Sequence, residues 1–167
     1  LLSPKDYLIY LLTGVQVSDR ATAKTILFYG EEDPSNFGLP SDIFPRVIDP
    51  WEEAAQTGTN FSRAAELSDG IAVYGGGPDA WNEALGAGAA RPGDMVEGTG
   101  TSTCITVCRR RGEGMNYHVV PDLDMDIQTL SSTGRSLLWI ARLLGKDARI
   151  LDELDLIEPA PLLFLPY

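Results

Sequence analysis

One stretch of the sequence decides the fold assignment: Ile71-Ala72-Val73-Tyr74-Gly75-Gly76-Gly77-Pro78-Asp79. Residues 71–74 are apolar and predict a short strand. Residues 80–90 are rich in alanine and predict a helix, because their apolar residues recur at helical spacing: Trp81, Ala84, Leu85 and Gly88. Glycines after a strand let the backbone pass close to a ligand, and the stretch therefore marks a candidate site at the start of a helix.

Asp79 is the candidate catalytic residue of this stretch. The dipole of a helix stabilises a carboxylate at its N-terminus by about 0.3–1 kcal/mol, so we expect Asp79 to stay ionised. An ionised aspartate at the edge of a cleft can accept the proton of a hydroxyl that attacks a phosphoryl group. A helix cap without catalytic role is the simpler interpretation of Asp79 taken alone.

A second glycine-rich segment, Gly98-Thr99-Gly100-Thr101-Ser102, joins two predicted strands at 95–97 and 103–108. A turn with successive N–H groups and hydroxyls can bind an anion, although an ordinary turn remains an alternative. A dinucleotide-binding fingerprint would need a third glycine where Thr103 stands. A Walker A loop would need a lysine, and the sequence has none between Lys24 and Lys146.

The rest of the chain predicts further helices, strands and loops. A helix begins at Pro4 after the capping residue Ser3 and ends at Gly14. The composition changes at 91–93, which makes this segment the candidate domain boundary. The other predicted elements are a helix at 19–27, a loop at 29–50 with a short helix at 41–44, a strand at 117–120, a helix capped by 131–134 and ended by Gly145, a helix or loop at 152–158, and a strand at 162–167.

Composition narrows the classes of partner. The chain has 167 residues and a formal net charge of −11, which disfavours nucleic acid and anionic membranes because both attract basic surfaces. A local loop could still bind a nucleotide. No apolar run approaches the ~20 residues of a membrane-spanning helix. The two cysteines are too few for a disulfide scaffold and favour a reducing cytosol, and the apolar ends suggest a piece of a longer protein.

Four other features favour structural roles over chemistry. Cys104 and Cys108 lack a second ligand pair nearby in sequence and are expected to pack as small apolar residues. His118 stands in an apolar segment, where a structural partner is the more common role. The run 109–111 of three arginines predicts an exposed hairpin end. Trp81 is expected to be part of the core.

Several segments, in order along the chain, resemble the FGGY carbohydrate kinases. Residues 4–8 and 12–14 are similar to the family's PKDYL and LTG segments, and residues 18–22 to its TDxSxAS stretch. The remaining similar segments are 76–79, 85–88 and 91–93 (GGGD…ALGxGxxxPG), 100–102 (GTS), 132–134 with 138–139 (the start of the interdomain helix) and 163–167 (LFLPY).

The resemblance implies an α/β, actin-like ATPase (ribonuclease H-like) fold with two domains around a cleft, only partly present. Residues 1–91 would be the C-terminal part of the first, sugar-binding domain. Residues 92–167 would be the N-terminal part of the second, ATP-binding domain. The first phosphate loop and the adenine pocket of such kinases would lie outside the chain, which alone should be inactive.

The resemblance also implies a function: an ATP-dependent, xylulokinase-like enzyme that phosphorylates a pentulose or related polyol. Asp79 would bind the sugar and act as general base, and Gly100, Thr101 and Ser102 would hold the ATP phosphates, bridged by Mg²⁺. The protein would be cytoplasmic, with a homodimer as one assembly open to it. The alternatives are a non-catalytic sugar or nucleotide sensor of the same fold, and an unrelated binding domain in which Asp79 and Thr101 lie far apart.

Three departures from the family pattern bear on the site. Pro78 replaces the usual glycine before the aspartate, although some xylulose-kinase-like members share it. Ala80 stands where many members carry Asn or Gln, which puts a sugar contact at that position in doubt. The spacing around 29–37 is shorter than in the family.

Overall fold

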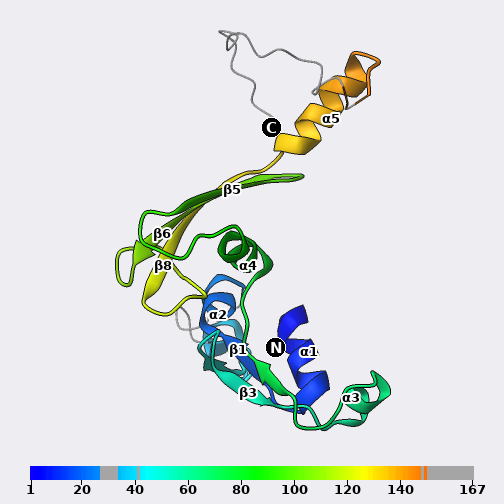
Figure 1. Cartoon of the computed structure of the whole chain (residues 1–167). Coiled ribbons are helices and arrows are strands. Elements are labelled where there is room, and N and C mark those ends of the chain that lie inside the picture. The colour runs from blue at the N-terminus through cyan, green and yellow to red at the C-terminus, as the bar shows by residue number, and fades with distance from the viewer. Residues whose placement is uncertain (27–33, 41, 148, 150–167) are drawn as a thin grey trace.

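A computed structural model describes residues 1–26, 34–40, 42–147 and 149 of the chain (Figure 1). Its helices are α1 (Pro4–Thr13), α2 (Arg20–Ile26), the short 3-10 helix η1 (Pro34–Phe37), α3 (Asn60–Ala64), α4 (Asp79–Gly86) and α5 (Thr133–Leu143). Its strands are β1 (Val17–Asp19), β2 (Arg46–Ile48), β3 (Glu53–Gln56), β4 (Ala72–Tyr74), β5 (Met95–Thr99), β6 (Thr103–Arg110), β7 (Asn116–Tyr117) and β8 (Leu123–Leu130).

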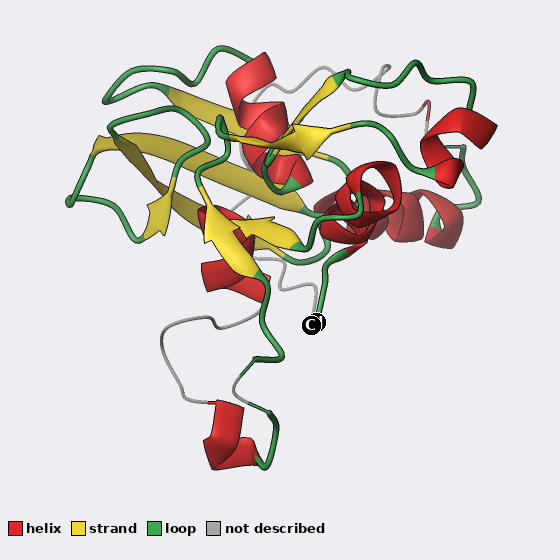
Figure 2. Cartoon of the chain, turned by 90° about the horizontal axis from the view of Figure 1, so that it is seen from below, coloured by secondary structure: helices red, strands yellow, loops and turns green. Residues whose placement is uncertain are grey.

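The strands form three separate groups (Figure 2). Strands β1 and β2 pair in parallel, and β3 and β4 pair antiparallel. The largest sheet has four antiparallel strands in the order β5-β6-β8-β7. Because β5 and β6 are consecutive, their connection is a tight turn, which places residues 100–102 at one end of this sheet.

Helix α1 begins and ends as its sequence predicts. The Ser3 side chain accepts a hydrogen bond from the Asp6 N–H, the Asp6 carboxylate accepts one from the Ser3 N–H, and Pro4 occupies the first turn. Gly14 ends the helix in the left-handed conformation, with φ of 77°. Both termini are therefore fixed by local chemistry, which sets where the side chains of residues 5 and 6 point.

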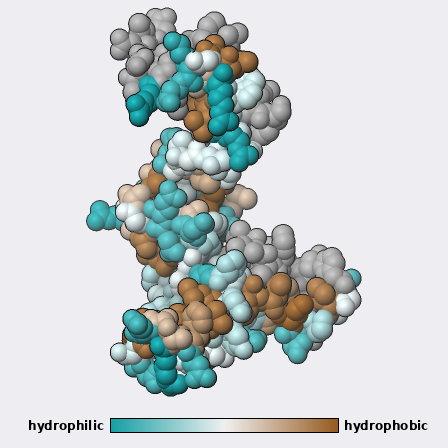
Figure 3. Space-filling view, turned by 90° about the vertical axis from the view of Figure 1, so that its right-hand side faces the viewer, coloured by the Kyte–Doolittle hydropathy of each residue, from teal (hydrophilic) through white to brown (hydrophobic). Residues whose placement is uncertain are grey.

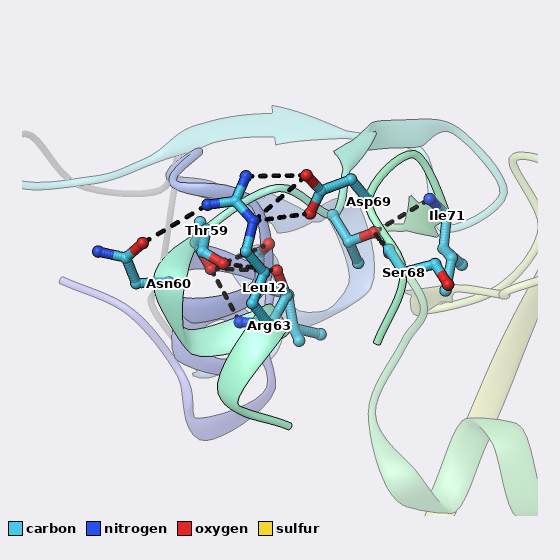
Figure 4. A network of polar contacts seen from close by, with 9 residues as sticks. Leu12, Thr59, Asn60, Arg63, Ser68, Asp69 and Ile71 are labelled. Atoms are coloured by element: carbon cyan, nitrogen blue, oxygen red, sulfur yellow. Dashed lines mark hydrogen bonds and ion pairs between the residues drawn. The ribbon is translucent and has the colours of Figure 1, made fainter. Parts of the chain in front are cut away.

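Helix α3 is held to α1 by a polar network (Figure 4). The Thr59 hydroxyl accepts the Ser62 N–H as an N-cap and donates to the Leu11 carbonyl at 2.6 Å. Arg63 donates to both carboxylate oxygens of Asp69 on the exposed side. This network closes the end of the molecule opposite the four-stranded sheet (Figure 1).

Two apolar clusters form the core. The first joins Ala21, Trp81 and Met125 from α2, α4 and β8, and also contains Ala84, Ala89, Cys108 and Val119. The second, between α1, β1 and β2, contains Ile9, Val17 and Ile48. The first cluster spans the segment 91–93, so α4 packs against elements on both sides of that segment.

Three predictions about local structure need correction. The sequence predicts a short helix at 41–44, but residues 42–44 form turns and bends. Position 41 lies outside the described residues. The predicted strand at 117–120 is only β7, since 118–120 are irregular, and the eight-residue strand β8 follows instead. The alternation of Leu123, Met125 and Ile127 with polar residues was its signal. Leu85, one of the apolar residues at helical spacing in α4, is 37% exposed and does not join Trp81 and Ala84 in the core.

Strands β1, β2 and β3 were not predicted from the sequence, and each has only three or four residues. The strand at β4, the β5–β6 hairpin and helices α1, α2, α4 and α5 are confirmed. The elements predicted at 152–158 and 162–167, and the LFLPY segment at 163–167, lie outside the described residues.

Helix α5 carries an exposed apolar surface, visible as brown side chains at the top of Figure 3. Its exposed large apolar residues are Leu137, Leu138, Trp139 and Leu143. Only Ala141 of this helix is buried. None of the helices in the described part of the chain has the length and hydrophobicity needed to cross a membrane.

Candidate functional site

Asp79 is the first residue of α4, directly after Pro78 at the N-cap. Its Oδ1 accepts a hydrogen bond from the Ala80 N–H at 2.8 Å, and the side chain is exposed. Pro78 has φ of −56°, which its ring imposes, so the chain enters the helix in a fixed direction. The carboxylate is thus at a helix N-terminus, where negative charge is favoured, with its second oxygen open to a ligand.

A pocket of about 310 Å³ lies beside this carboxylate, and we call it the Asp79 pocket. Its walls come from three regions of the chain: the start of α1, the side of α2, and the segment before α4. The lining residues are Ser3, Pro4, Lys5, Thr22, Gly77, Pro78 and Asp79. Thr22 is only 1% exposed, and its hydroxyl has no hydrogen-bond partner among the described residues.

Lys5 supplies the positive charge of the Asp79 pocket. Its Nζ lies 2.6 Å from Asp6 Oδ1, 2.7 Å from the Gly75 carbonyl oxygen and 3.0 Å from Asp19 Oδ2. The contact with Asp19 is an ion pair without the alignment of a hydrogen bond. Both carboxylates are fully buried, so Lys5 neutralises charge that water cannot reach.

The glycines before Asp79 allow close approach of two parts of the chain. Gly76 has φ of +63°, a conformation that other residues rarely adopt. A side chain at Gly77 would overlap Cγ1 of Val119, in the segment between β7 and β8. The Asn82 side chain donates to the Gly77 carbonyl at 2.8 Å. The segment is therefore fixed by steric contact as well as by hydrogen bonds.

The turn of residues 100–102 is closed by backbone hydrogen bonds to itself and to α5. The Gly100 N–H donates to the Ser102 carbonyl, and the N–H groups of Gly134 and Arg135 donate to the carbonyls of Gly100 and Thr101. A Cβ at Gly134 would overlap the Gly100 carbonyl oxygen. Within the described residues, the N–H groups of Thr101 and Ser102 have no backbone partner, so they remain donors for an anion.

A second pocket, of about 460 Å³, lies beside this turn, and we call it the turn pocket. It is lined by Gly100, Thr101, Gly134, Arg135, Leu137 and Leu138. Ser102 is not among the lining residues. Asp79 and Thr101 therefore line two different pockets and do not meet in the described structure.

Helix α4 packs against β5, the strand that leads to the turn of residues 100–102. Asp79 lies at its first position, and Glu83, one turn later, reaches Gly98 on β5, where an added Cβ would lie 3.1 Å from Glu83 Oε1. Gly98 is two residues before Gly100. The candidate base and the candidate phosphate turn are thus on neighbouring elements that pack against each other.

Three of the residues predicted to have structural roles are buried, whereas Cys104 is only partly buried. Trp81 is buried, and its Nε1 donates to the Tyr117 carbonyl at 2.8 Å. His118 is fully buried with Nδ1 accepting the Val120 N–H; burial lowers its pKa, and the Ala89 backbone offsets part of that effect. Cys108 is also buried, and burial and then the Asp94 charge raise the pKa of its thiol. The arginines at 109–111 lie at the exposed end of β6.

Two features of the structure in and near the site were not predicted from the sequence. Lys5 and Thr22 line the Asp79 pocket, but each is far from residue 79 in sequence. Three cations surround the ring of Tyr117: Arg20 and Lys24 at 5.5 Å and Arg111 at 5.1 Å from its centroid. The helical spacing of residues 20 and 24 was the only sequence signal for this cluster of cations, and it did not identify Tyr117 as their aromatic partner.

Comparison with known proteins shows that the chain shares its fold with part of the sugar kinases. The sequence matches no model of a protein family. It is 26% identical over 187 aligned residues to the xylulose kinase of Lactococcus lactis, covering 100% of the chain and 37% of that protein. It is 36% identical over 116 residues to the xylulose kinase of Streptomyces rubiginosus, covering 65% of the chain and 24% of that protein.

Solved structures give the same result. The xylulose kinase of Rhodospirillum rubrum matches with a TM-score of 0.79 and 28% identity, over 93% of the chain and 35% of that structure. The gluconate kinase of Lactobacillus acidophilus matches with a TM-score of 0.78 and 16% identity, over 95% of the chain and 36% of that structure. The chain spans about a third of these proteins and has that part of their actin-like ATPase fold, as predicted.

Proposed function

We propose that the chain is part of an ATP-dependent sugar kinase of the FGGY carbohydrate kinase family. The kinase transfers the γ-phosphoryl group of ATP to a hydroxyl of a pentulose or related polyol, with xylulose as the first candidate. The relatives named xylulose kinase support this substrate class. The observation that carries the proposal is the position of Asp79, at a helix N-terminus, beside a glycine segment and on the wall of a pocket.

In this proposal Asp79 accepts the proton of the sugar hydroxyl as that hydroxyl attacks the phosphoryl group. The carboxylate stands at a helix N-terminus, where negative charge is favoured, and its Oδ1 accepts the Ala80 N–H. The Thr22 hydroxyl lines the pocket and has no hydrogen-bond partner among the described residues, so it is available to a hydroxyl group of the ligand. The base and the bound sugar would thus share the Asp79 pocket.

The turn of residues 100–102 would hold phosphate oxygens of the nucleotide. The N–H groups of Thr101 and Ser102 and their two hydroxyls are donors that fit such oxygens, while α5 holds the carbonyl side of the turn. No cluster of three or more His, Cys, Asp or Glu side chains suited to a metal occurs in the described ranges. In this proposal Mg²⁺ would be bound by the nucleotide phosphates. Mg²⁺ would neutralise charge that develops on the phosphates during transfer.

The proposed division of the chain follows from the same assignment. Residues 1–91 belong to the sugar-binding domain and residues 92–167 to the ATP-binding domain of a cytoplasmic enzyme. The Asp79 pocket lies in the first part and the turn pocket in the second. Transfer then requires the two pockets to face one cleft that other parts of the longer protein complete.

A substrate panel on the full-length protein tests the proposal. Pentuloses, glycerol and hexuloses are each incubated with ATP and Mg²⁺, and the phosphorylated product and ADP are measured. We expect one pentulose or related polyol to be phosphorylated and to raise the melting temperature of the protein. Binding of a sugar without any ADP formation would instead support a sensor of the same fold.

A further inference from the structure

We propose that Lys5 is a positioning residue for the segment that carries Asp79. The inference rests on the proposed function, in which Asp79 is the general base. Lys5 acts by fixing the backbone at Gly75, four residues before the carboxylate, and not by touching the reactants. Lys5 stands in the first turn of α1, whose start is set by the capping box of Ser3 and Asp6.

The Lys5 ammonium is held by three protein oxygens. Its Nζ donates hydrogen bonds to Asp6 at 2.6 Å and to the Gly75 carbonyl at 2.7 Å, and it forms an ion pair with Asp19 at 3.0 Å. Lys5 lines the Asp79 pocket with 27% of its side-chain surface exposed, while its Nζ is bound to these three oxygens. This geometry favours a positioning role over direct catalysis.

The two carboxylates that hold Lys5 are themselves fixed by helix N-termini. Asp6 accepts the Ser3 N–H in the capping box of α1. Asp19 Oδ1 accepts the N–H groups of Ala21 and Thr22 at 2.9 and 3.0 Å, at the start of α2. Both side chains are fully buried. The ammonium is therefore held at a point determined by α1 and α2 together.

The Gly75 carbonyl connects the Lys5 ammonium to the segment that carries Asp79. On the other side of the same segment, the Gly75 N–H donates to the Glu52 carbonyl and the Gly76 N–H donates to the Pro50 carbonyl. Lys5 provides the opposing contact at 2.7 Å. The peptide plane at Gly75 is thus fixed from both sides, and the left-handed Gly76 and the rigid Pro78 transmit its orientation to Asp79.

A double-mutant cycle in the full-length protein tests the inference. Lys5→Met is made in the wild type and in the Asp79→Asn background, and kcat and KM for the phosphorylated sugar are measured. A residue that acts only through Asp79 has no further effect once Asp79 is replaced. Lys24→Met is the matched control, because Lys24 also donates to a backbone carbonyl, that of Met115 at 2.8 Å, but lines neither pocket.

The expected result is a fall in kcat of about 10- to 100-fold for Lys5→Met, with KM for the sugar changed less than about twofold. In the Asp79→Asn background the same substitution should change kcat less than about twofold. Equal losses in both backgrounds would overturn the positioning role while leaving Asp79 as the base. An unchanged kcat in Asp79→Asn alone would instead overturn the proposed function.

Lys5→Arg keeps the cycle decisive if Lys5→Met does not fold, because Lys5→Met leaves two buried carboxylates without a cation. Arginine keeps the charge but replaces the three-point ammonium by a planar fork. We expect Lys5→Arg to fold, to lower kcat by less than Lys5→Met, and to lose its effect in the Asp79→Asn background. An undiminished effect of Lys5→Arg in that background would count against the inference.

Discussion

The Asp79 pocket and the turn pocket are built in different ways. The Asp79 segment is held by a buried charge cluster, by backbone hydrogen bonds on both sides and by the contact of Gly77 with Val119. The turn of residues 100–102 depends on its own backbone and on α5, whose large apolar side chains are mostly exposed. The first pocket therefore has walls from three regions of the chain, whereas the second is bounded by one turn and by a helix with an exposed apolar face.

The largest expected effect concerns the charge cluster. Lys5→Met leaves the buried carboxylates of Asp6 and Asp19 without a cation, and breaking a buried ion pair in this way costs about 3–5 kcal/mol. We expect the free energy of unfolding of the full-length protein to fall by about 3 kcal/mol, measured by urea unfolding. Asp69→Asn, at the exposed pair with Arg63, is the control and should change stability very little. Equal losses for the two variants would contradict the account of the first pocket.

The next effect concerns the close contact at Gly77. Gly77→Ala forces a methyl group against Val119, and overpacking of this kind costs about 1–3 kcal/mol. Because the shift moves the Asp79 segment, KM for the sugar should rise and kcat should fall, while KM for ATP stays near its wild-type value. Gly86→Ala is the matched control, since a Cβ at Gly86 meets no atom within 4 Å. Steady-state kinetics of the two variants would show whether the close contact matters.

The corresponding substitution in the second pocket is Gly134→Ala. The new methyl group would overlap the Gly100 carbonyl oxygen and displace the turn from α5. We expect KM for ATP to rise about tenfold, equivalent to about 1.4 kcal/mol, with KM for the sugar nearly unchanged. A rise in KM for the sugar alone would mean that the turn belongs to the sugar side of the site.

The smallest effect is a pH dependence at His118, which lies between the two regions. Burial lowers the pKa of His118 in the folded protein, so the unfolded chain binds the proton more readily. Stability should be unaffected above the ordinary pKa of histidine and should fall as the pH drops below about 6.5. The melting temperature of His118→Gln should fall less between pH 7.5 and pH 5.5 than that of the wild type. The same decrease for both proteins would exclude His118 as its source.

Local chemistry explains which elements could be predicted from the sequence. The capping box at Ser3 and Asp6 and the glycine segment before Asp79 depend on near neighbours, and the structure confirms the helices that they predict. Strand β8 was missed because its aspartates hid the alternation of apolar residues. Both aspartates form ion pairs with arginines from the end of the neighbouring hairpin, Asp126 with Arg109 at 2.7 Å and Asp124 with Arg111 at 3.0 Å. Pairing of this kind is set by tertiary structure and not by local preference.

The candidate site likewise has one part that local sequence pattern predicts and another that depends on tertiary contacts. The positions of Asp79 at a helix start and of Gly100, Thr101 and Ser102 at a hairpin turn follow from sequence pattern, but their catalytic and phosphate-binding roles remain predictions. The contribution of Lys5 could not be predicted, because its partner Gly75 is 70 residues away in sequence. The hydrogen bonds of Gly134 and Arg135 to the turn likewise join segments that only the fold brings together.

The most direct test of the proposed role of Asp79 is a single-turnover measurement of phosphoryl transfer to the preferred sugar in the full-length protein. Asp79→Asn should slow transfer by about 10²- to 10⁴-fold while the sugar still binds, since a general base contributes that much to rate. Asp122→Asn is the control, because Asp122 is exposed, lines neither pocket and has φ of 61°, which asparagine tolerates. Transfer by Asp79→Asn at the wild-type rate would contradict the assignment of Asp79 as the catalytic base.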